Sequence, residues 1–307
     1  MNSRPFTVGI ASGKGGTGKT SVATSLARVA TERGRSVILV DGDVDAPNAA
    51  LFLPAEIADS RVVSALIPEV DPSVCTLCGD CAKVCRYKAI AVLGPTVLVF
   101  PELCHGCGGC RIVCPVGAIT EVEHRVGEVR RRPGLEYNLV EGILDIGEVK
   151  APLLIQEALR EAGAWDRRAD LRLIDSPPGT SCAVVACLTE ADYLLLVTEP
   201  TPFGLHDLKL AVKLGRTMDL PMGVVLNRDG SGDTDIAGFC HEAGVPLLVR
   251  IPFSRQVAGA YAQGQDLLSS SAEWSAAINL LYESLAAFET QMRGTVDMSS
   301  VSDGGES

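Results

Sequence analysis

Apolar runs of strand length recur along the chain, and helical stretches separate them. The run Phe6 to Ala11 enters a glycine-rich turn, and residues 21–34 then carry apolar positions at helical spacing before the apolar run 36–43. Further apolar runs occupy residues 171–179, 193–202, 222–228 and 247–253. Apolar strands that alternate with helices predict an α/β fold, with a mostly parallel sheet covered by helices on both faces. Functional groups are then expected at the carboxyl ends of the strands.

The last helical stretch, Trp274 to Met292, is amphipathic. Its polar side carries glutamates, whereas a helix that binds a membrane surface usually has a basic polar face, so we predict that it packs on the sheet. We expect residues 295–307 to form a disordered tail. The apolar face comprises Trp274, Ala277, Ile278, Leu281, Leu285 and Phe288.

Composition limits the functional classes. The 307 residues, 47% of them hydrophobic, can bury either one large core or a core with a small appended module. No run approaches the ~20 apolar residues of a membrane span, and the first residues lack a signal-peptide pattern, so we expect a cytoplasmic protein without a membrane anchor. A net charge of -11 weighs against nucleic acid as a partner, because a nonspecific binder needs a basic face.

Residues 13–20 fit the phosphate-binding pattern GxxxxGK[ST], directly after a strand and before a helix, which predicts a P-loop NTPase. Glycines let backbone N–H groups converge on phosphate oxygens, while Lys19 reaches the β- and γ-phosphates and the Thr20 hydroxyl binds Mg²⁺. The alternative is a glycine-rich turn without a ligand. The predicted nucleotide-binding stretch comprises Gly13, Lys14, Gly15, Gly16, Thr17, Gly18, Lys19, Thr20 and Ser21.

Carboxylates follow two of the predicted strands. Asp41, Asp43 and Asp45 stand where a magnesium ion and an attacking water would lie. Capping of the loop is the alternative for Asp43 and the preferred interpretation for the other two. Asp175 ends a later strand and is predicted to be a second carboxylate beside the magnesium ion, with the Gly179 backbone sensing the γ-phosphate.

Five motifs in order, KGGTGKT, DGDVDAPN, IDSPPGT, VTEPTPFGLHDL and VLNR, resemble the deviant Walker A ATPases of the MinD and Mrp group, whose relatives include the nitrogenase iron protein. The resemblance implies a homodimer that sandwiches ATP, in which Lys14 reaches the partner's nucleotide and neutralises charge during phosphoryl transfer. It also implies that Asp43 positions the attacking water and that Asn227 contacts adenine. The alternative for Asn227 is an ordinary polar residue at the end of a strand.

Eight of the eleven cysteines lie in two repeated units, CTLCGDCAKVCRYKAI and CHGCGGCRIVCPVGAI. Each unit has the CxxCxxCxxxC spacing of bacterial ferredoxins, in which three cysteines hold one 4Fe–4S cluster and the fourth crosses to the other cluster. Zinc is the alternative metal, although four-cysteine zinc sites usually combine two separated CxxC pairs. We assign Cys75, Cys78, Cys81 and Cys114 to the first cluster, and Cys104, Cys107, Cys110 and Cys85 to the second.

The cysteine-rich segment resembles an inserted two-cluster ferredoxin. It departs from the family at Arg86, where proline is usual, and keeps the proline at Pro115. We expect residues 1–70 and 126–294 to form a discontinuous ATPase domain and residues 71–125 to form a small α+β ferredoxin-like insert. Cys187 and Cys240 are predicted to be core residues. A bridging-cluster role is an alternative for Cys182, which follows Asp175 by seven residues.

Three functions fit this combination of ATP, Mg²⁺ and two 4Fe–4S clusters. The first is an ATPase whose nucleotide-dependent homodimer gates electron transfer to an unknown redox partner. The second is a carrier or assembly factor that delivers clusters to an unknown acceptor protein. The third is a positioning or partitioning ATPase with structural clusters, which the acidic balance disfavours. The insert lies between two loops expected to respond to the γ-phosphate, so we expect ATP to alter the exposure, docking or potential of the clusters.

Overall fold

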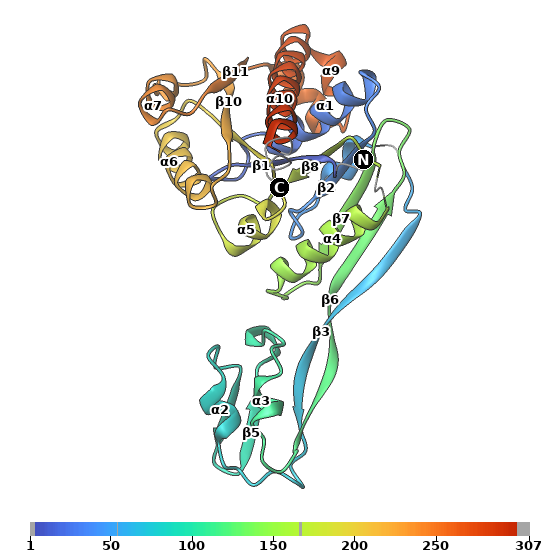
Figure 1. Cartoon of the computed structure of the whole chain (residues 1–307), viewed down its shortest axis with the longest axis vertical. Helices are drawn as coiled ribbons and strands as arrows, with labels where there is room; N and C mark the ends of the chain where they lie inside the picture. The colour runs from blue at the N-terminus through green and yellow to red at the C-terminus, as the bar shows by residue number, and fades with distance from the viewer. Residues whose placement is uncertain (1–3, 54, 166–167, 300–307) are drawn as a thin grey trace, which may run out of the picture.

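A single mostly parallel sheet organises the computed structural model, which describes residues 4–53, 55–165 and 168–299 (Figure 1). The pairings from β11 through β7 are parallel, whereas β6 pairs antiparallel with both β7 and β3. In spatial order, the strands are β11 Leu247–Pro252, β10 Met222–Asp229, β9 Tyr193–Thr198, β1 Phe6–Ala11, β8 Leu171–Asp175, β2 Val37–Asp41, β7 Asn138–Leu144, β6 Ile119–Arg132 and β3 Asp59–Val70.

The central strands are apolar without interruption because both of their faces are covered. In β2, Val37 and Leu39 join the hydrophobic cluster on one face of the sheet, while Ile38 and Val40 join the cluster on the other face. The predicted α/β fold is confirmed. Helices α1 Lys19–Glu32, α8 Arg255–Ala262, α9 Leu267–Ser270 and α10 Ala272–Ser299 cover the first face, and helices α4 Ala151–Trp165, α5 Cys182–Leu188, α6 Pro202–Thr217 and α7 Ile236–Ala243 cover the second.

Helix α10 packs on the sheet as predicted, with Trp274, Ile278 and Leu281 in the core. It continues to Ser299, however, so residues 295–299 are helical rather than part of a disordered tail. Once a helix is formed, extending it by one residue is far less costly than nucleating a new one, and no proline stops it here. The remaining residues of the expected tail, 300–307, lie outside the described part. No helix in the described part of the chain combines the length and the hydrophobicity of a membrane span.

Strands β3 and β6 form a long antiparallel arm that extends from the edge of the sheet (Figure 1). Near the sheet, Val63 of β3 and Val126 of β6 are buried in the core beneath α4, whereas farther along β3 Leu66 is half-exposed. Strand β6 runs unbroken across the expected domain boundary between residues 125 and 126. The arm is therefore a direct continuation of the central sheet.

A small module lies at the far end of the arm (Figure 1). It has two small hydrophobic clusters, one around Ile67 and Ala89 and the other around Ile90 and Ile119, and cysteines belong to both. Its elements are α2 Asp80–Val84, the hairpin strands β4 Ile90–Leu93 and β5 Thr96–Val99, the short helix η2 Pro101–Leu103, and α3 Gly109–Ile112.

Candidate functional site

The glycine-rich loop between β1 and α1 needs its glycines for space and for backbone conformation. Gly18 has φ 97°, and a Cβ atom there would lie 2.4 Å from the Asn227 side-chain nitrogen. A Cβ atom on Gly13 would lie 2.5 Å from the backbone oxygen of Asp207. The loop leads directly into α1 at Lys19, so the N-terminal N–H groups of this helix face the site.

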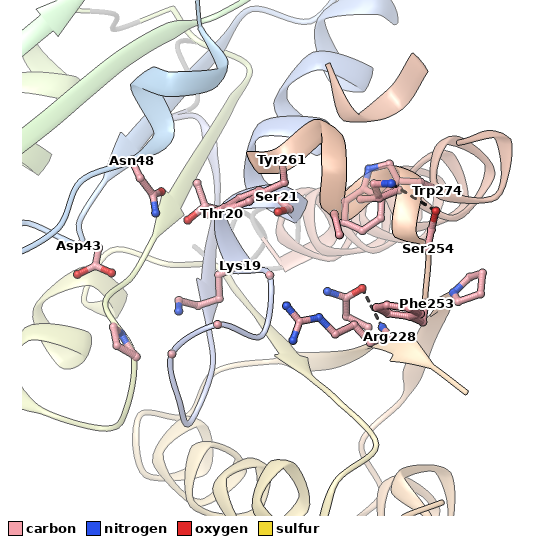
Figure 2. Close-up of a pocket in the computed structure, with 18 residues that line it drawn as sticks. Lys19, Thr20, Ser21, Asp43, Asn48, Arg228, Phe253, Ser254, Tyr261 and Trp274 are labelled. Atoms are coloured by element: carbon pink, nitrogen blue, oxygen red, sulfur yellow. Dashed lines mark hydrogen bonds between the residues drawn. The ribbon is translucent and has the colours of Figure 1, made fainter. Parts of the chain in front are cut away.

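A cavity lies against this loop, at the carboxyl edge of the sheet (Figure 2). Lys19, Thr20 and Asp43 lie toward one side of the cavity, while Arg228 and Phe253 lie toward the other, and Tyr261 lies beside Thr20 and Ser21. This separation of polar and aromatic groups suits a ligand that has phosphates at one end and a base at the other. The predicted residues that line the cavity are Gly15, Gly16, Gly18, Lys19, Thr20, Ser21, Asp43 and Asn227.

Two buried polar atoms beside the cavity have no hydrogen-bond partner among the described residues. They are the Thr17 hydroxyl oxygen and Oδ1 of Asp175. The other carboxylate oxygen of Asp175 accepts a hydrogen bond from the Thr20 hydroxyl. Unpaired buried oxygens are costly, and Mg²⁺ prefers oxygen ligands together with substrate phosphates. Thr20 and Asp175 therefore fit a magnesium–nucleotide complex.

Asp41 caps the loop that carries Asp43, as the sequence analysis predicted for this residue. Its carboxylate accepts backbone hydrogen bonds from Asp43 at 3.1 Å and from Asn48 and Ala49 at 2.9 Å each. Burial and the neighbouring Asp175 nevertheless raise the pKa of Asp41 to about 8, and burial raises the pKa of Asp175 to about 6. Asp43 is less buried and lines the cavity, whereas Asp45 is exposed.

Lys14 does not line the cavity beside it. Its ammonium forms an ion pair with Glu199, which also contacts Arg228 at 3.1 Å. The Lys14 side chain is about one-third exposed. The sequence motifs gave no sign of this contact, because Glu199 follows β9 and lies 185 residues away in the chain.

Two predicted residues make internal contacts. Asn227 donates its side-chain N–H to the Thr17 carbonyl at 2.7 Å and accepts the Arg228 N–H at 2.9 Å, so it braces the phosphate-binding loop. The Gly179 N–H donates to the Ser12 carbonyl at 2.9 Å. Their adenine and γ-phosphate roles stay predictions, and a γ-phosphate contact would require the Gly179 bond to open.

Two aromatic residues that line the cavity, Phe253 and Tyr261, were not predicted. Phe253 follows β11, and Tyr261 lies on α8, where its ring packs 5.2 Å from the Phe52 ring between their centroids. Both belong to segments whose pattern alone indicates an ordinary strand and an ordinary helix. Only the tertiary fold brings them to the cavity that Lys19 also lines.

The eight repeated cysteines surround two cavities in the module. Cys75, Cys78, Cys81 and Cys114 line one cavity, and Cys85, Cys104, Cys107 and Cys110 line the other. The structure thus brings each assigned set of four together. Each set includes one cysteine from the opposite repeat. No group of three or more His, Cys, Asp or Glu side chains is arranged around a single metal ion in the described ranges.

The backbone of the module repeats as its sequence does. Left-handed conformations occur at Leu77 and Lys88 in the first unit and, 29 residues later in each case, at Gly106 and Gly117 in the second. Ala89 and Ala118, also equivalent, donate their N–H groups to cysteine sulfurs at 3.3 Å. Backbone N–H groups aimed at sulfur stabilise thiolate ligands, so the donor set fits 4Fe–4S clusters.

The other cysteines differ in exposure. Cys187 and Cys240 are buried, which confirms their predicted place in the core. Cys182 is exposed at the start of α5, three residues after Gly179. Its bridging role stays an untested alternative.

Comparisons with known proteins agree with this fold. A sequence profile described as the CobQ/CobB/MinD/ParA nucleotide binding domain matches residues 8–268. An uncharacterized protein of Methanocaldococcus jannaschii is 30% identical over 291 residues, which span 92% of this chain and 96% of that protein. A cytosolic Fe-S cluster assembly factor Nubp1 homolog of Drosophila melanogaster is 30% identical over 188 residues, which span 50% of this chain and 59% of that protein.

Among solved structures, the septum site-determining protein MinD of Pyrococcus horikoshii, complexed with Mg-ADP, aligns with a TM-score of 0.58. It is 22% identical, and the alignment covers 92% of this chain and 96% of that chain. MinD of Pyrococcus furiosus aligns with the same TM-score at 23% identity, covering 92% and 98%. At these identities the likeness shows the fold.

The raised pKa values of Asp41 and Asp175 predict how stability depends on pH. The folded chain holds these protons to higher pH than the unfolded chain does, so without Mg²⁺ and nucleotide their contribution to the free energy of unfolding falls as pH rises from about 4 to 8. Asp41→Asn should reduce the fall between pH 6 and 8 by about 1–2 kcal/mol, measured by urea denaturation. The exposed Asp233→Asn serves as the control, and an unchanged slope in Asp41→Asn would contradict the assignment.

Proposed function

The chain belongs to the CobQ/CobB/MinD/ParA nucleotide-binding domain family, and we propose that within this family it is an ATP-hydrolysing iron–sulfur protein. In this proposal a nucleotide-dependent homodimer gates electron transfer through two 4Fe–4S clusters. The single observation that carries it is the pair of four-cysteine cavities at the end of an arm that continues the nucleotide-binding sheet. We also propose that the chain acts in the cytoplasm. The similarity to the Nubp1 homologs, whose name describes them as cytosolic, supports this location.

The nucleotide chemistry follows from the cavity residues. Lys19 and the first turn of α1 neutralise phosphate charge, Thr20 and Asp175 hold magnesium, and Asp43 positions the attacking water. Lys14 acts on the partner's nucleotide. The ammonium of Lys14 pairs with Glu199 outside its own cavity, which supports this role, and Lys14 must leave this ion pair to reach the partner's nucleotide.

Each proposed cluster would have all four of its cysteine ligands in one chain. A complete ligand set favours a cluster that stays on the protein, and a retained cluster favours electron transfer over cluster delivery. Each cavity is lined by four cysteines of one chain, whereas a cluster made for transfer is more easily released from an incomplete or shared ligand set. When bound, the clusters would supply one-electron carriers. The chain itself would fix their spacing through the hydrogen-bonded backbone of the two repeats.

Cluster delivery is the second candidate, favoured by the similarity to the Nubp1 assembly-factor homologs over half of this chain. An apo 4Fe–4S protein mixed with the loaded chain and MgATP distinguishes the two. Iron that moves to the apo protein would select delivery. If the clusters are first reduced chemically and the excess reductant is removed, iron that stays on the chain while a redox dye takes up their electrons in an ATP-dependent manner would select electron transfer.

Replacing Lys14 tests the dimer-based part of the proposal. Lys14→Ala should lower the ATP turnover rate at least about ten-fold, because a cation supplied in trans stabilises charge in the transition state. The affinity for ATP should change little, since Lys14 does not line its own cavity. Lys213→Ala, on the exposed side of α6, is the matched control, and an unchanged turnover rate in Lys14→Ala would rule out catalysis in trans.

Iron content tests the metal assignment. Anaerobically purified chain should contain about eight iron and eight sulfide atoms. Cys107→Ser should retain about four of each, because it removes one ligand of the second cluster at an exposed position. The control Cys240→Ser, in the core of α7, should keep all eight if it folds, which circular dichroism reports. Zinc in place of iron in the wild-type chain would overturn the assignment.

A further inference from the structure

Lys150, directly before α4, is hydrogen-bonded to the module. Its Nζ donates to the Pro101 carbonyl at 2.8 Å, and Pro101 begins the turn that leads to Cys104. We infer that Lys150 is a positioning residue that carries the nucleotide state of the ATPase domain to the second cysteine cavity. This inference rests on the proposed function and adds the route by which it is regulated.

The contact is part-buried and electrostatically anchored. The side chains of Lys150 and Glu148 are only 10% and 5% exposed, and their ion pair spans 2.9 Å. Glu148 also accepts the Val149 N–H at 2.8 Å and pairs with His124, on the arm strand β6, at 2.8 Å. Burial would raise the pKa of Glu148, but the hydrogen bonds from Lys150, Val149 and His124 together lower it. A buried pair with all partners in place fixes one geometry, because displacing either charge leaves the other uncompensated.

From Lys150 the contacts lead to a cluster ligand. The Pro101 carbonyl that accepts Lys150 Nζ also accepts the Cys104 N–H at 3.1 Å. The Gly106 N–H in turn donates to Cys104 Sγ at 3.4 Å. A shift of Lys150 would therefore move the turn that holds Cys104 and change the distance between a positive charge and the second cavity.

In the other direction the contacts lead to the nucleotide. The Leu144 N–H, at the end of β7, donates at 2.9 Å to the carbonyl of Val44, which is the residue after Asp43. The chain then turns through Asp145, whose carbonyl accepts the Glu148 N–H at 3.0 Å, and reaches Lys150. A short series of hydrogen bonds thus connects the Asp43 loop, which is expected to adjust to the γ-phosphate, with Lys150 and the module.

Helix α4 gives this path a rigid support. Its buried face, with Leu154 and Ile155, packs against the sheet beside Val44 and contacts α5, which follows the Gly179 loop. The Asp43 loop and the Gly179 loop are both expected to sense the γ-phosphate. Both are therefore connected, through Val44 and α5, to helix α4, which Lys150 directly precedes. The arm alone would let the module pivot, whereas the Lys150 contact gives it a second attachment.

Hydrogen–deuterium exchange of the full-length, anaerobically loaded chain tests the inference. In the wild type, a slowly hydrolysed ATP analogue with Mg²⁺ should change exchange of the amides in residues 102–106. Lys150→Met, which keeps the length but removes the charge and the donor, should speed this exchange about ten-fold without nucleotide and abolish the response to the analogue. Lys150→Arg should restore the response, and the exposed Lys88→Met, within the module, should behave as the wild type does.

Iron content and ATP turnover on the same samples separate this inference from the proposed function. Lys150→Met should keep about eight iron atoms, so that faster exchange is not loss of the module's fold. Wild-type exchange in Lys150→Met, with or without the analogue, would overturn the inference even if iron and ATP turnover are as proposed. A wild-type chain without iron would overturn the proposed function. In that case, the exchange of Lys150→Met without nucleotide would still show whether the hydrogen bond from Lys150 to Pro101 holds the turn before Cys104.

Discussion

The parallel pairing of the central strands is the constraint on which the rest of the molecule depends. Because β8 pairs in parallel with both β1 and β2, their carboxyl ends reach the same edge of the sheet. The phosphate-binding loop after β1, the Asp43 loop after β2 and Asp175 at the end of β8 therefore meet without any long connection. Apolar side chains on both faces of these strands hold the arrangement, so the polar groups can be buried where they meet.

The same sheet also carries the module. Strands β7, β6 and β3 extend it beyond the nucleotide cavity, and the last two continue together until they leave the core. A hydrogen-bonded pair of strands transmits displacement along its length better than a flexible linker does. The module is attached to the sheet at two points, through the arm strands β3 and β6 and through the hydrogen bond from Lys150 to Pro101. Both attachments are connected to the segment that follows Asp43, where the Val44 carbonyl accepts the Leu144 N–H. In the function proposed above, this double attachment would link ATP to the clusters.

Patterns local in sequence predicted most of the nucleotide-binding core. An apolar run of strand length that ends in turn residues, such as residues 193–198, indicates a buried strand, and the residues from Gly13 to Ser21 form a recognisable phosphate-binding motif. The cysteine spacing also assigned two ligand sets, which the fold brings together. The arm was not foreseen, because strand β3 mixes charges, a proline and apolar residues, and alternation weakens where both faces meet solvent.

Contacts between segments that are distant in the chain could not be predicted from the sequence. Three contacts depend on how the chain folds back: Glu199 beside Lys14, Tyr261 in the lining of the nucleotide cavity, and Pro101 beside Lys150. An ion pair or a hydrogen bond to a carbonyl needs no particular spacing, so it leaves no motif. The end of α10 was misplaced for a different reason, since a polar composition does not stop a helix that is already formed.

The central claim is that nucleotide and clusters are energetically linked. The most direct test is an EPR-monitored redox titration of the anaerobically purified chain, with and without Mg²⁺ and a slowly hydrolysed ATP analogue. The account predicts that the analogue shifts the midpoint potential of at least one cluster by roughly 60 mV, a tenfold change in equilibrium constant for a one-electron couple. Identical titration curves in the two conditions would contradict it.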